Sequence, residues 1–258
     1  MSYSIMLDAG HGGRDPGAVY NGRREKDDTL SLTLAIGELL QEHGIDVLYT
    51  RTTDIYESPY QKALEANAAG ADLFLSIHRN SYPTDNTVSG VESLVYNKSG
   101  LKYTMAQNIN EGLEALGFIN LGVKERPGLV VLRRTQMPAV LVEVGFINSD
   151  TDNRLFDDNF DDIALAIAEG ILDTLEESGE ISSDSSLPHY AVQTGAFRSE
   201  RYARRLLNEL TELNFPAVLT EGDGLFRVVV GEYDTLDEAV NMERRLKRAG
   251  YQTVIVTI

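Results

Sequence analysis

The chain alternates short apolar runs with segments in which apolar residues recur every three or four positions. Continuous apolar runs predict buried strands at 5–7, 45–49, 73–77, 91–96 and 139–144. Amphipathic spacing predicts helices at about 26–42, 60–69, 103–116 and 160–175. This alternation predicts an α/β domain with a mostly parallel, twisted sheet and helices on both of its faces.

A polar, serine-rich run follows the last of these helices. Such a run cannot bury enough apolar surface to offset the entropy of ordering it, so it is typical of a flexible linker. We therefore predict a first domain at 1–178, a linker at 179–187 and a second domain at 188–258.

The second domain contains an internal repeat with an offset of 36 residues. The segment 192–197 matches 228–233, and the same offset pairs Ala203 with Ala239, Leu210 with Leu246, Phe215 with Tyr251, and Val218 with Val254. Each copy has the pattern strand, amphipathic helix, strand. The repeat therefore predicts a small α+β, ferredoxin-like βαββαβ domain, with both helices on one face of the sheet and the other face open.

Charge and cysteine content narrow the functional classes. The formal net charge of -17 argues against a nucleic-acid partner, which needs a basic surface. The acidity is uneven, because 1–187 carries 14 Lys and Arg against 30 Asp and Glu, whereas 188–258 carries 9 against 10. The absence of cysteine excludes thiol catalysis and cysteine-bound metals, so any metal ligand must be His, Asp or Glu. No apolar run has membrane-spanning length, and the first residues lack the pattern of a secretory signal, so we expect no membrane insertion and synthesis in the cytoplasm without a signal peptide.

Three candidate metal ligands fall at one edge of the predicted sheet. His11 follows the first strand between glycines, His78 ends the third strand, and Glu25 stands at the start of the first helix. The carboxyl ends of parallel strands meet at one edge, where chemistry collects in such folds. Two imidazoles and one carboxylate, with a fourth position left to water, are typical of catalytic zinc.

Glu143 lies near the end of the apolar run 139–146, where a carboxylate is costly unless it has a partner. Beside a zinc-activated water it would serve as a general base. Glu92, also on a predicted strand, is a rival acid. Structural roles remain the alternative for each of these residues when spacing alone is considered, and Glu25 could simply be an acid favoured by the helix dipole.

A structural role is our interpretation for the other histidines and for two acids of the first helix. These residues are His43, His189, Asp27 and Asp28.

Four blocks of the sequence resemble a known family. They are 8–18 (DAGHGGRDPGA), 25–27 (EKD), 76–80 (SIHRN) and 142–149 (VEVGFINS). In order and content they resemble the signature blocks of zinc-dependent N-acetylmuramoyl-L-alanine amidases of the amidase-3 type, over residues 3–176. The resemblance implies zinc on His11, Glu25 and His78, with Glu143 as the catalytic acid and base. It also implies cleavage of the amide between the lactyl group of muramic acid and L-alanine, and we place Asn80 among the substrate-binding residues.

Two positions depart from the family pattern without touching a ligand. Lys62 stands where Arg is frequent, and Ala9 where Pro is frequent. We expect the first difference to alter a structural ion pair.

The second domain resembles SPOR domains in residues 190–197 (YAVQTGAF) and 226–231 (FRVVVG). The resemblance implies binding to peptidoglycan, with a preference for glycan strands stripped of stem peptides. Gln193, Arg227 and Val229 are in phase and are predicted on the open face of the sheet, where Gln193 and Arg227 suit sugar hydroxyls and carbonyls. Ordinary solvated strand positions are the alternative for each of them.

The sequence leaves two other functions open. One is a different zinc amide hydrolase, such as a peptidase or a deacetylase, on the same ligands. The other is a noncatalytic wall-binding protein, although both histidines, Glu25 and Glu143 are retained. For the amidase, we expect action on the cell wall after lysis or holin release, as in a sporulation lysin or a phage endolysin.

Overall fold

The computed structural model describes residues 3–179, 190–222, 224–233 and 236–257. The chain divides into two compact units, Met1–Ser186 and Leu187–Ile258. The predicted linker at 179–187 lies outside the described residues, apart from Gly179, which caps the last helix of the first unit. Within the described ranges, no helix is both long and apolar enough to cross a bilayer.

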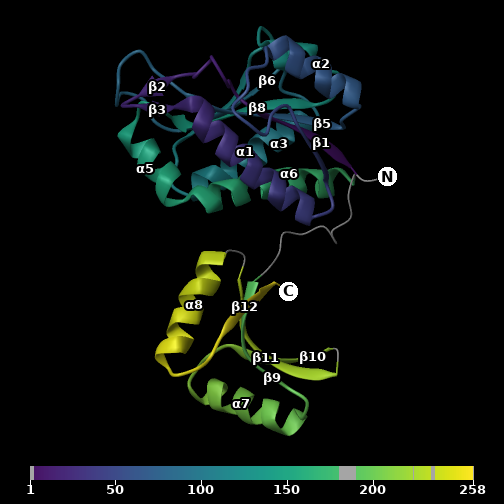
Figure 1. The fold of residues 1–258 in the computed structure, drawn as a ribbon, viewed down its shortest axis with the longest axis vertical. Coiled ribbons are helices and arrows are strands. Elements are labelled where there is room, and N and C mark those ends of the chain that lie inside the picture. The colour runs from purple at the N-terminus through teal and green to yellow at the C-terminus, as the bar shows by residue number, and fades with distance from the viewer. Residues whose placement is uncertain (1–2, 180–189, 223, 234–235, 258) are drawn as a thin grey trace. The chain divides into compact units, whose positions relative to one another are not determined.

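The first unit is built on a six-stranded sheet (Figure 1). In spatial order its strands are β4 (Asp46–Tyr49), β1 (Ser4–Ala9), β5 (Leu73–Asn80), β8 (Ala139–Phe146), β6 (Val91–Val95) and β7 (Asn120–Glu125). Every neighbouring pair is parallel except β6 and β8. The predicted mostly parallel sheet is confirmed, and the reversal of β6 brings its first residues to the edge where β5 and β8 end.

Helices cover both faces of this sheet, as predicted (Figure 1). On one face lie α1 (Glu25–Glu42), α3 (Leu101–Ala115) and α6 (Phe160–Ser178); on the other lie α2 (Pro59–Ala69) and α4 (Val130–Arg134). The core under α2 and α4 includes Met6, Phe74, Leu94 and Leu141. Because side chains alternate along a strand, Asp8, His78, Glu143 and Glu92 lie on this same face, closer to the carboxyl edge.

Local sequence explains where α2 begins and ends. The Ser58 hydroxyl accepts a hydrogen bond from the Gln61 N–H at 3.2 Å, and Pro59 occupies the first turn. Gly70 ends the helix in the left-handed conformation, with φ of 67°. The helix predicted at 60–69 therefore lies within one residue of the observed α2.

Several short elements were not predicted. They are the hairpin of β2 (Val19–Tyr20) and β3 (Arg23–Arg24), strand β7, helix α4 and helix α5 (Asp150–Asp158). Each of them is too short, or too polar, to show a clear periodic spacing of apolar residues. Helix α5, for example, buries only Asp152 and Phe156.

The second unit has the predicted ferredoxin-like βαββαβ order (Figure 1). Its elements are β9 (Tyr190–Phe197), α7 (Glu200–Glu212), β10 (Ala217–Gly222), β11 (Leu225–Tyr233), α8 (Leu236–Arg248) and β12 (Val254–Thr257). The sheet order is β10-β11-β9-β12, and all three pairings are antiparallel.

The core of the second unit explains the 36-residue repeat. Equivalent positions of the two copies are fully buried in one cluster, namely Val192 with Val228, Ala203 with Ala239, and Leu210 with Leu246. Phe215 and its equivalent Tyr251 meet edge to face, with ring centroids 6.4 Å apart. The repeat thus encodes two half-domains that bury the same positions against each other.

Candidate active site

A tight turn after β1 presents His11. His11 has a φ of 60°, and the turn is closed by two backbone hydrogen bonds between Gly12 and Asp15, of 2.9 and 3.0 Å. Gly10 is required here, because a Cβ at this position would lie 2.5 Å from the His78 ring. The rings of His11 and His78 can therefore approach to a centroid separation of 5.0 Å.

Glu25, the first residue of α1, joins the two imidazoles. Its carboxylate oxygens lie 3.1 Å from His11 Nε2 and 2.8 Å from His78 Nδ1. Gly17, with a φ of 66°, packs against this group, and a Cβ there would lie 2.6 Å from both Glu25 Oε2 and His11 Cδ2. Glu25 as a residue is only 4% exposed, so its position is tightly defined.

These three side chains fit a metal ion. One ligand atom from each lies within 4.8 Å of the others, and two imidazoles with one carboxylate suit zinc. Asp15 accepts from His11 Nδ1 at 2.9 Å, which directs Nε2 inward, as outer partners of metal-bound histidines do. The structure thus brings together the three predicted ligands and adds Asp15, which stands four residues after His11 and was not predicted as part of the site.

Contacts between the carboxylates and the imidazoles favour the charged forms of both Glu25 and His11. Burial alone would raise the pKa of Glu25, but hydrogen bonds and charge from His11 and His78 outweigh burial and hold that pKa well below its usual range. For His11 burial acts in the other direction and lowers the pKa. Contacts with Glu25 and Asp15 outweigh burial and raise the pKa of His11 to about 9. The protein therefore holds an ionised carboxylate between two imidazole rings.

Glu143 lies beside this group on β8. It is opposite His78 of β5 on one side and opposite Glu92 of β6 on the other. Among the described residues, its buried Oε2 atom has no hydrogen-bond partner. Burial raises the pKa of Glu143 to about 7; His78 opposes this rise, whereas Glu25 and Glu92 add to it. Such a carboxyl can both accept and donate a proton near neutral pH.

Glu92, the rival candidate for the catalytic acid, has partners for its carboxylate oxygens within the protein. Its carboxylate accepts a hydrogen bond from Asn80 Nδ2 at 3.0 Å and forms an ion pair with Lys124. The Asn80 side-chain oxygen accepts from the Ser81 N–H at 2.8 Å. Asn80 thus lies at the site, two residues after His78, but both ends of its amide contact the protein. Its substrate-binding role stays a prediction.

A buried polar network lies at the end of β1, directly before the turn that carries His11. Asp8 forms an ion pair with Lys62 at 2.6 Å and accepts hydrogen bonds from Thr50 and Ser76 at 2.8 and 2.6 Å. Lys62 Nζ also donates to the Ala9 carbonyl at 2.8 Å. The lysine that departs from the family pattern is therefore the cation of a buried ion pair next to the ligand turn.

The remaining predicted residues of the first unit have structural contacts. His43 caps α1 and its Nδ1 lies 2.7 Å from the Leu39 carbonyl oxygen, as predicted for a helix end. Asp27 pairs with Arg24, and Asp28 pairs with Arg23 and Arg79. His189 lies outside the described residues.

In the second unit, Gln193, Arg227 and Val229 line one hollow of about 710 Å³ on the sheet, together with Val218, Thr220 and Val256 from β10 and β12. Gln193 is directly opposite Val229, and Arg227 donates to the Gly222 carbonyl at 2.9 Å. The three residues predicted to share the open face therefore do so.

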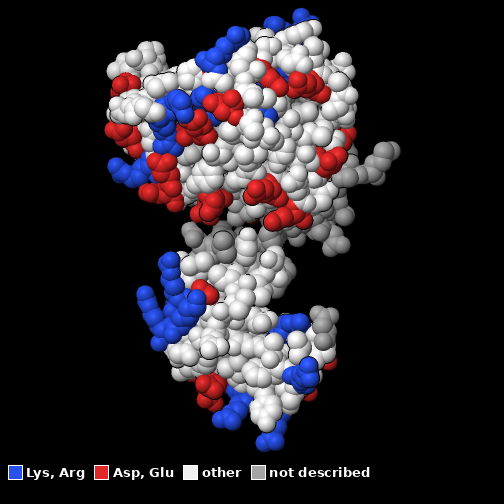
Figure 2. Space-filling model, in the orientation of Figure 1, with Lys and Arg blue, Asp and Glu red and all other residues white. Residues whose placement is uncertain are grey.

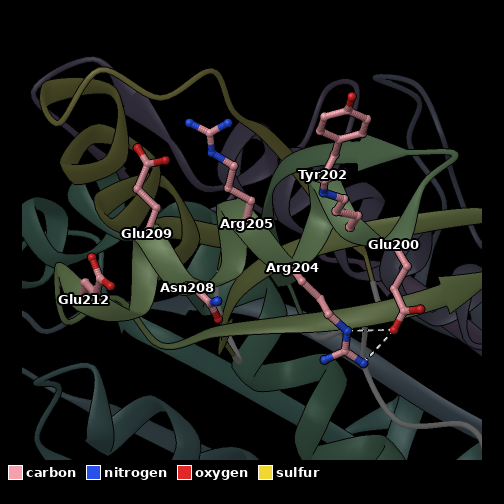
Figure 3. A pocket seen from close by; sticks show the side chains of 8 residues that line it. Glu200, Tyr202, Arg204, Arg205, Asn208, Glu209 and Glu212 are labelled. Atoms are coloured by element: carbon pink, nitrogen blue, oxygen red, sulfur yellow. Dashed lines mark hydrogen bonds and ion pairs between the residues drawn. The ribbon is translucent and has the colours of Figure 1, made fainter.

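A second hollow of this unit runs along α7 (Figure 3). All of its lining residues belong to that one helix, and Arg204 is paired with Glu200 at 2.6 Å. It is an exposed helix face with mixed charge. Figure 2 shows a further group of basic side chains over α8, whose last turn carries Arg245, Lys247 and Arg248.

Comparison with known proteins agrees with this geometry. Residues 5–173 match the N-acetylmuramoyl-L-alanine amidase family, and residues 186–257 match the SPOR domain. The chain belongs to the N-acetylmuramoyl-L-alanine amidase family. The amidase family match spans all three candidate ligands and Glu143.

Individual relatives support the assignment. The amidase is 36% identical to the sporulation-specific N-acetylmuramoyl-L-alanine amidase of Bacillus subtilis (strain 168) over 220 residues, 83% of each chain. It is 38% identical to an endolysin of Bacillus phage SPP1 over 184 residues, which cover 68% of this chain and 67% of the endolysin. The crystal structure of an N-acetylmuramoyl-L-alanine amidase from Clostridium difficile 630 matches with a TM-score of 0.65 and 32% identity, covering 69% of this chain and 99% of that one.

Proposed function

We propose that this peptidoglycan amidase is zinc-dependent, with His11, Glu25 and His78 as the protein ligands. The observation that carries the proposal is the convergence of these three side chains within 4.8 Å, beside a carboxylate whose buried oxygen has no partner in the described chain. Bound zinc would supply a Lewis acid that polarises the amide carbonyl and lowers the pKa of water. The bond cleaved is the amide between the lactyl group of N-acetylmuramic acid and the L-alanine of the stem.

Glu143 performs the proton transfers in this mechanism. Its Oε2 takes a proton from the attacking water as the C–O bond forms, and returns it to the nitrogen as the C–N bond breaks. The second proton of the water also ends on the nitrogen, so the products are a lactyl carboxylate and a protonated L-alanine amino group. Among the described residues, no group hydrogen-bonds to Oε2, so this oxygen is free to take up the proton and return it.

The second unit is proposed to hold the enzyme on its polymer. The hollow that contains Gln193 and Arg227 offers an amide and a guanidinium beside apolar valine side chains, a combination that suits sugar rings. Tethering raises the local concentration of the catalytic unit at the wall.

Zinc binding is tested by isothermal titration calorimetry of the metal-free protein. We expect one zinc per chain and loss of that binding in His11→Ala. The matched control is His43→Ala, which removes a histidine of structural role and should leave the zinc stoichiometry unchanged. Equal zinc binding by all three proteins would show that the metal does not use this site.

A further inference from the structure

Arg14 lies at the tip of the turn that presents His11. It stands between Gly12 and Asp15, whose backbone groups close the turn, and its side chain is exposed. Three residues of chain span at most about 11 Å, so the Arg14 Cα lies within that distance of the His11 Cα. The Arg14 backbone therefore lies beside the candidate metal site, and we refer to this turn as the rim of the site.

The position of Arg14 is fixed by a neighbouring loop. Its guanidinium carbon lies 4.4 Å from the centre of the Tyr56 ring. The loop is fastened to the turn by Asp54, which accepts a hydrogen bond from the Gly13 N–H at 2.7 Å and forms an ion pair with Lys26 at 2.6 Å. A guanidinium stacked over a ring keeps its in-plane N–H groups for other hydrogen bonds.

Arg14 also differs from the other basic residues around the candidate ligands. Buried Arg51 uses its N–H groups on the Ala9, Gly10 and Lys26 carbonyls. An Asp or Glu partner neutralises each of Arg23, Arg24, Lys26, Lys62, Arg79 and Lys124. Within the described ranges, no carboxylate lies at ion-pair distance from Arg14. Its guanidinium contacts the uncharged ring of Tyr56 instead. The rim thus offers one ordered positive charge to an incoming anion.

We propose that Arg14 binds a free carboxylate of the stem peptide and makes the enzyme select stems whose second residue is not amidated. The inference rests on the proposed function. The lactyl carboxyl of the substrate is consumed in the scissile amide, so the acidic groups nearest to that bond belong to the peptide. The planar fork of arginine matches a carboxylate with two parallel hydrogen bonds, which an amide cannot accept in the same way.

The test compares two muramoyl pentapeptides that differ only in whether the α-carboxyl of the second stem residue is free or amidated. For the wild-type enzyme we expect kcat/KM to favour the free carboxylate roughly tenfold, mainly through KM. Arg14→Gln should lose this preference by reacting more slowly with the free acid, while its rate on the amide is unchanged. Arg14→Lys, which keeps the charge but loses the fork, should keep only part of the preference.

Arg154→Gln is the matched control, because Arg154 is an exposed arginine of α5 and its loss changes the net charge equally. It should keep the wild-type ratio; a similar loss there would assign the preference to overall charge and overturn the proposal. Equal rates of the wild type on both peptides, or an unchanged ratio in Arg14→Gln, would also overturn it.

A binding measurement separates this proposal from the proposed function. Glu143→Gln protein is titrated with the same two peptides, with and without Arg14→Gln, in a calorimeter. Failure of the wild type to cleave either peptide would contradict the amidase mechanism, but the ratio of the two affinities would still decide the role of Arg14. If Glu143→Gln protein binds the free-acid and the amidated peptide with equal affinity, the proposed role of Arg14 in carboxylate recognition is wrong.

Discussion

Two neighbouring carboxylates show how a single residue acquires its role. Glu143 and Glu92 face each other on adjacent strands, yet Glu92 is satisfied by Asn80 and Lys124 while Glu143 keeps a buried oxygen without a described partner. The charge of Glu92 also adds to the raised pKa of Glu143. The difference between them lies in their hydrogen-bond partners, not in their residue type.

Replacing Glu143 with Gln should separate metal binding from turnover. The amide keeps the shape of the side chain but cannot accept the proton, and general acid–base groups contribute about 100- to 10,000-fold. We expect zinc stoichiometry and folding to be retained and the hydrolysis rate to fall by that amount. Glu92→Gln is the control, with a loss of less than about tenfold; the opposite ranking of the two variants would make Glu92 the catalytic acid.

Asp15 should tune zinc affinity from outside the ligand set. Its hydrogen bond to His11 Nδ1 fixes the ring, and removal of such partners typically costs about 10- to 100-fold in metal affinity. We expect Asp15→Asn to weaken zinc by that factor in competition with a chelating dye. Asp27→Asn, an acid of α1 that pairs with Arg24, should leave zinc affinity unchanged; equal weakening by both would contradict a specific role for Asp15.

Much of the site could be predicted from the sequence, because several of its candidate residues stand near the ends of apolar strands. His11, His78 and Glu143 each stand near the end of a strongly apolar strand, which fixes their edge of the sheet. The sequence could not show which neighbouring acid was satisfied, because the partners of Glu92 come from β5 and from the unpredicted β7. The family resemblance favoured Glu143, but only the assembled sheet shows that Glu92 has hydrogen-bond partners that Glu143 Oε2 lacks.

At the scale of elements, one buried ion pair connects α2 to the first strand. Lys62 of α2 is 3% exposed and Asp8 of β1 is 1% exposed. Burial would raise the pKa of Asp8, but Lys62 and Ser76 outweigh it and lower that pKa. Ionised Asp8 therefore stabilises the fold above its unfolded pKa of about 3.9, and this contribution is lost as the pH falls through the lower folded value.

Lys62→Met should accordingly destabilise the first unit in a pH-dependent way. Removing one partner of a buried pair typically costs about 3–5 kcal/mol, because the other charge is left uncompensated. We expect that loss in urea unfolding at pH 7. The loss should shrink as the pH falls toward 4, because without the lysine burial raises the pKa of Asp8 and the variant's Asp8 becomes protonated. Lys62→Arg keeps the pair and should retain most of the stability; a pH-independent loss in Lys62→Met would show that packing alone is responsible.

Elements were predictable in proportion to their length and burial. The long amphipathic helices gave a clear period, and the buried strands gave continuous apolar runs. The second unit was predicted from its repeat, because its two halves bury equivalent residues such as Leu210 and Leu246. The antiparallel direction of β6 could not be inferred, since a buried strand reads alike in either direction. That direction is what brings Glu92 next to Glu143.

At the scale of the whole molecule, the two units differ in charge and in task. The acidic first part has no electrostatic reason to approach an anionic wall, whereas 188–258 is nearly neutral. Cutting the chain at about Ser183 should leave an active first fragment that sediments poorly with intact walls. The fragment from Leu187 onward should cosediment with peptidoglycan without cleaving it, and an active first fragment that sediments fully by itself would contradict this division.

Wall binding by the second fragment should depend on sugar contacts rather than on bulk charge. Its affinity should therefore weaken only slightly as the salt concentration rises past about 0.15 M, where the Debye length is about 8 Å. Cosedimentation is compared on walls with and without stem peptides, at low and high salt. Equal binding to both walls that disappears at high salt would indicate nonspecific adhesion.

The central claim is zinc-dependent cleavage of one particular amide, and its direct test is to identify the ends released from purified peptidoglycan by mass spectrometry. With zinc-loaded enzyme we expect new L-alanine amino termini and intact glycan strands, with no product after chelation and recovery when zinc is added back. New termini elsewhere in the stem, new reducing sugar ends, or full activity of the metal-free protein would contradict the account.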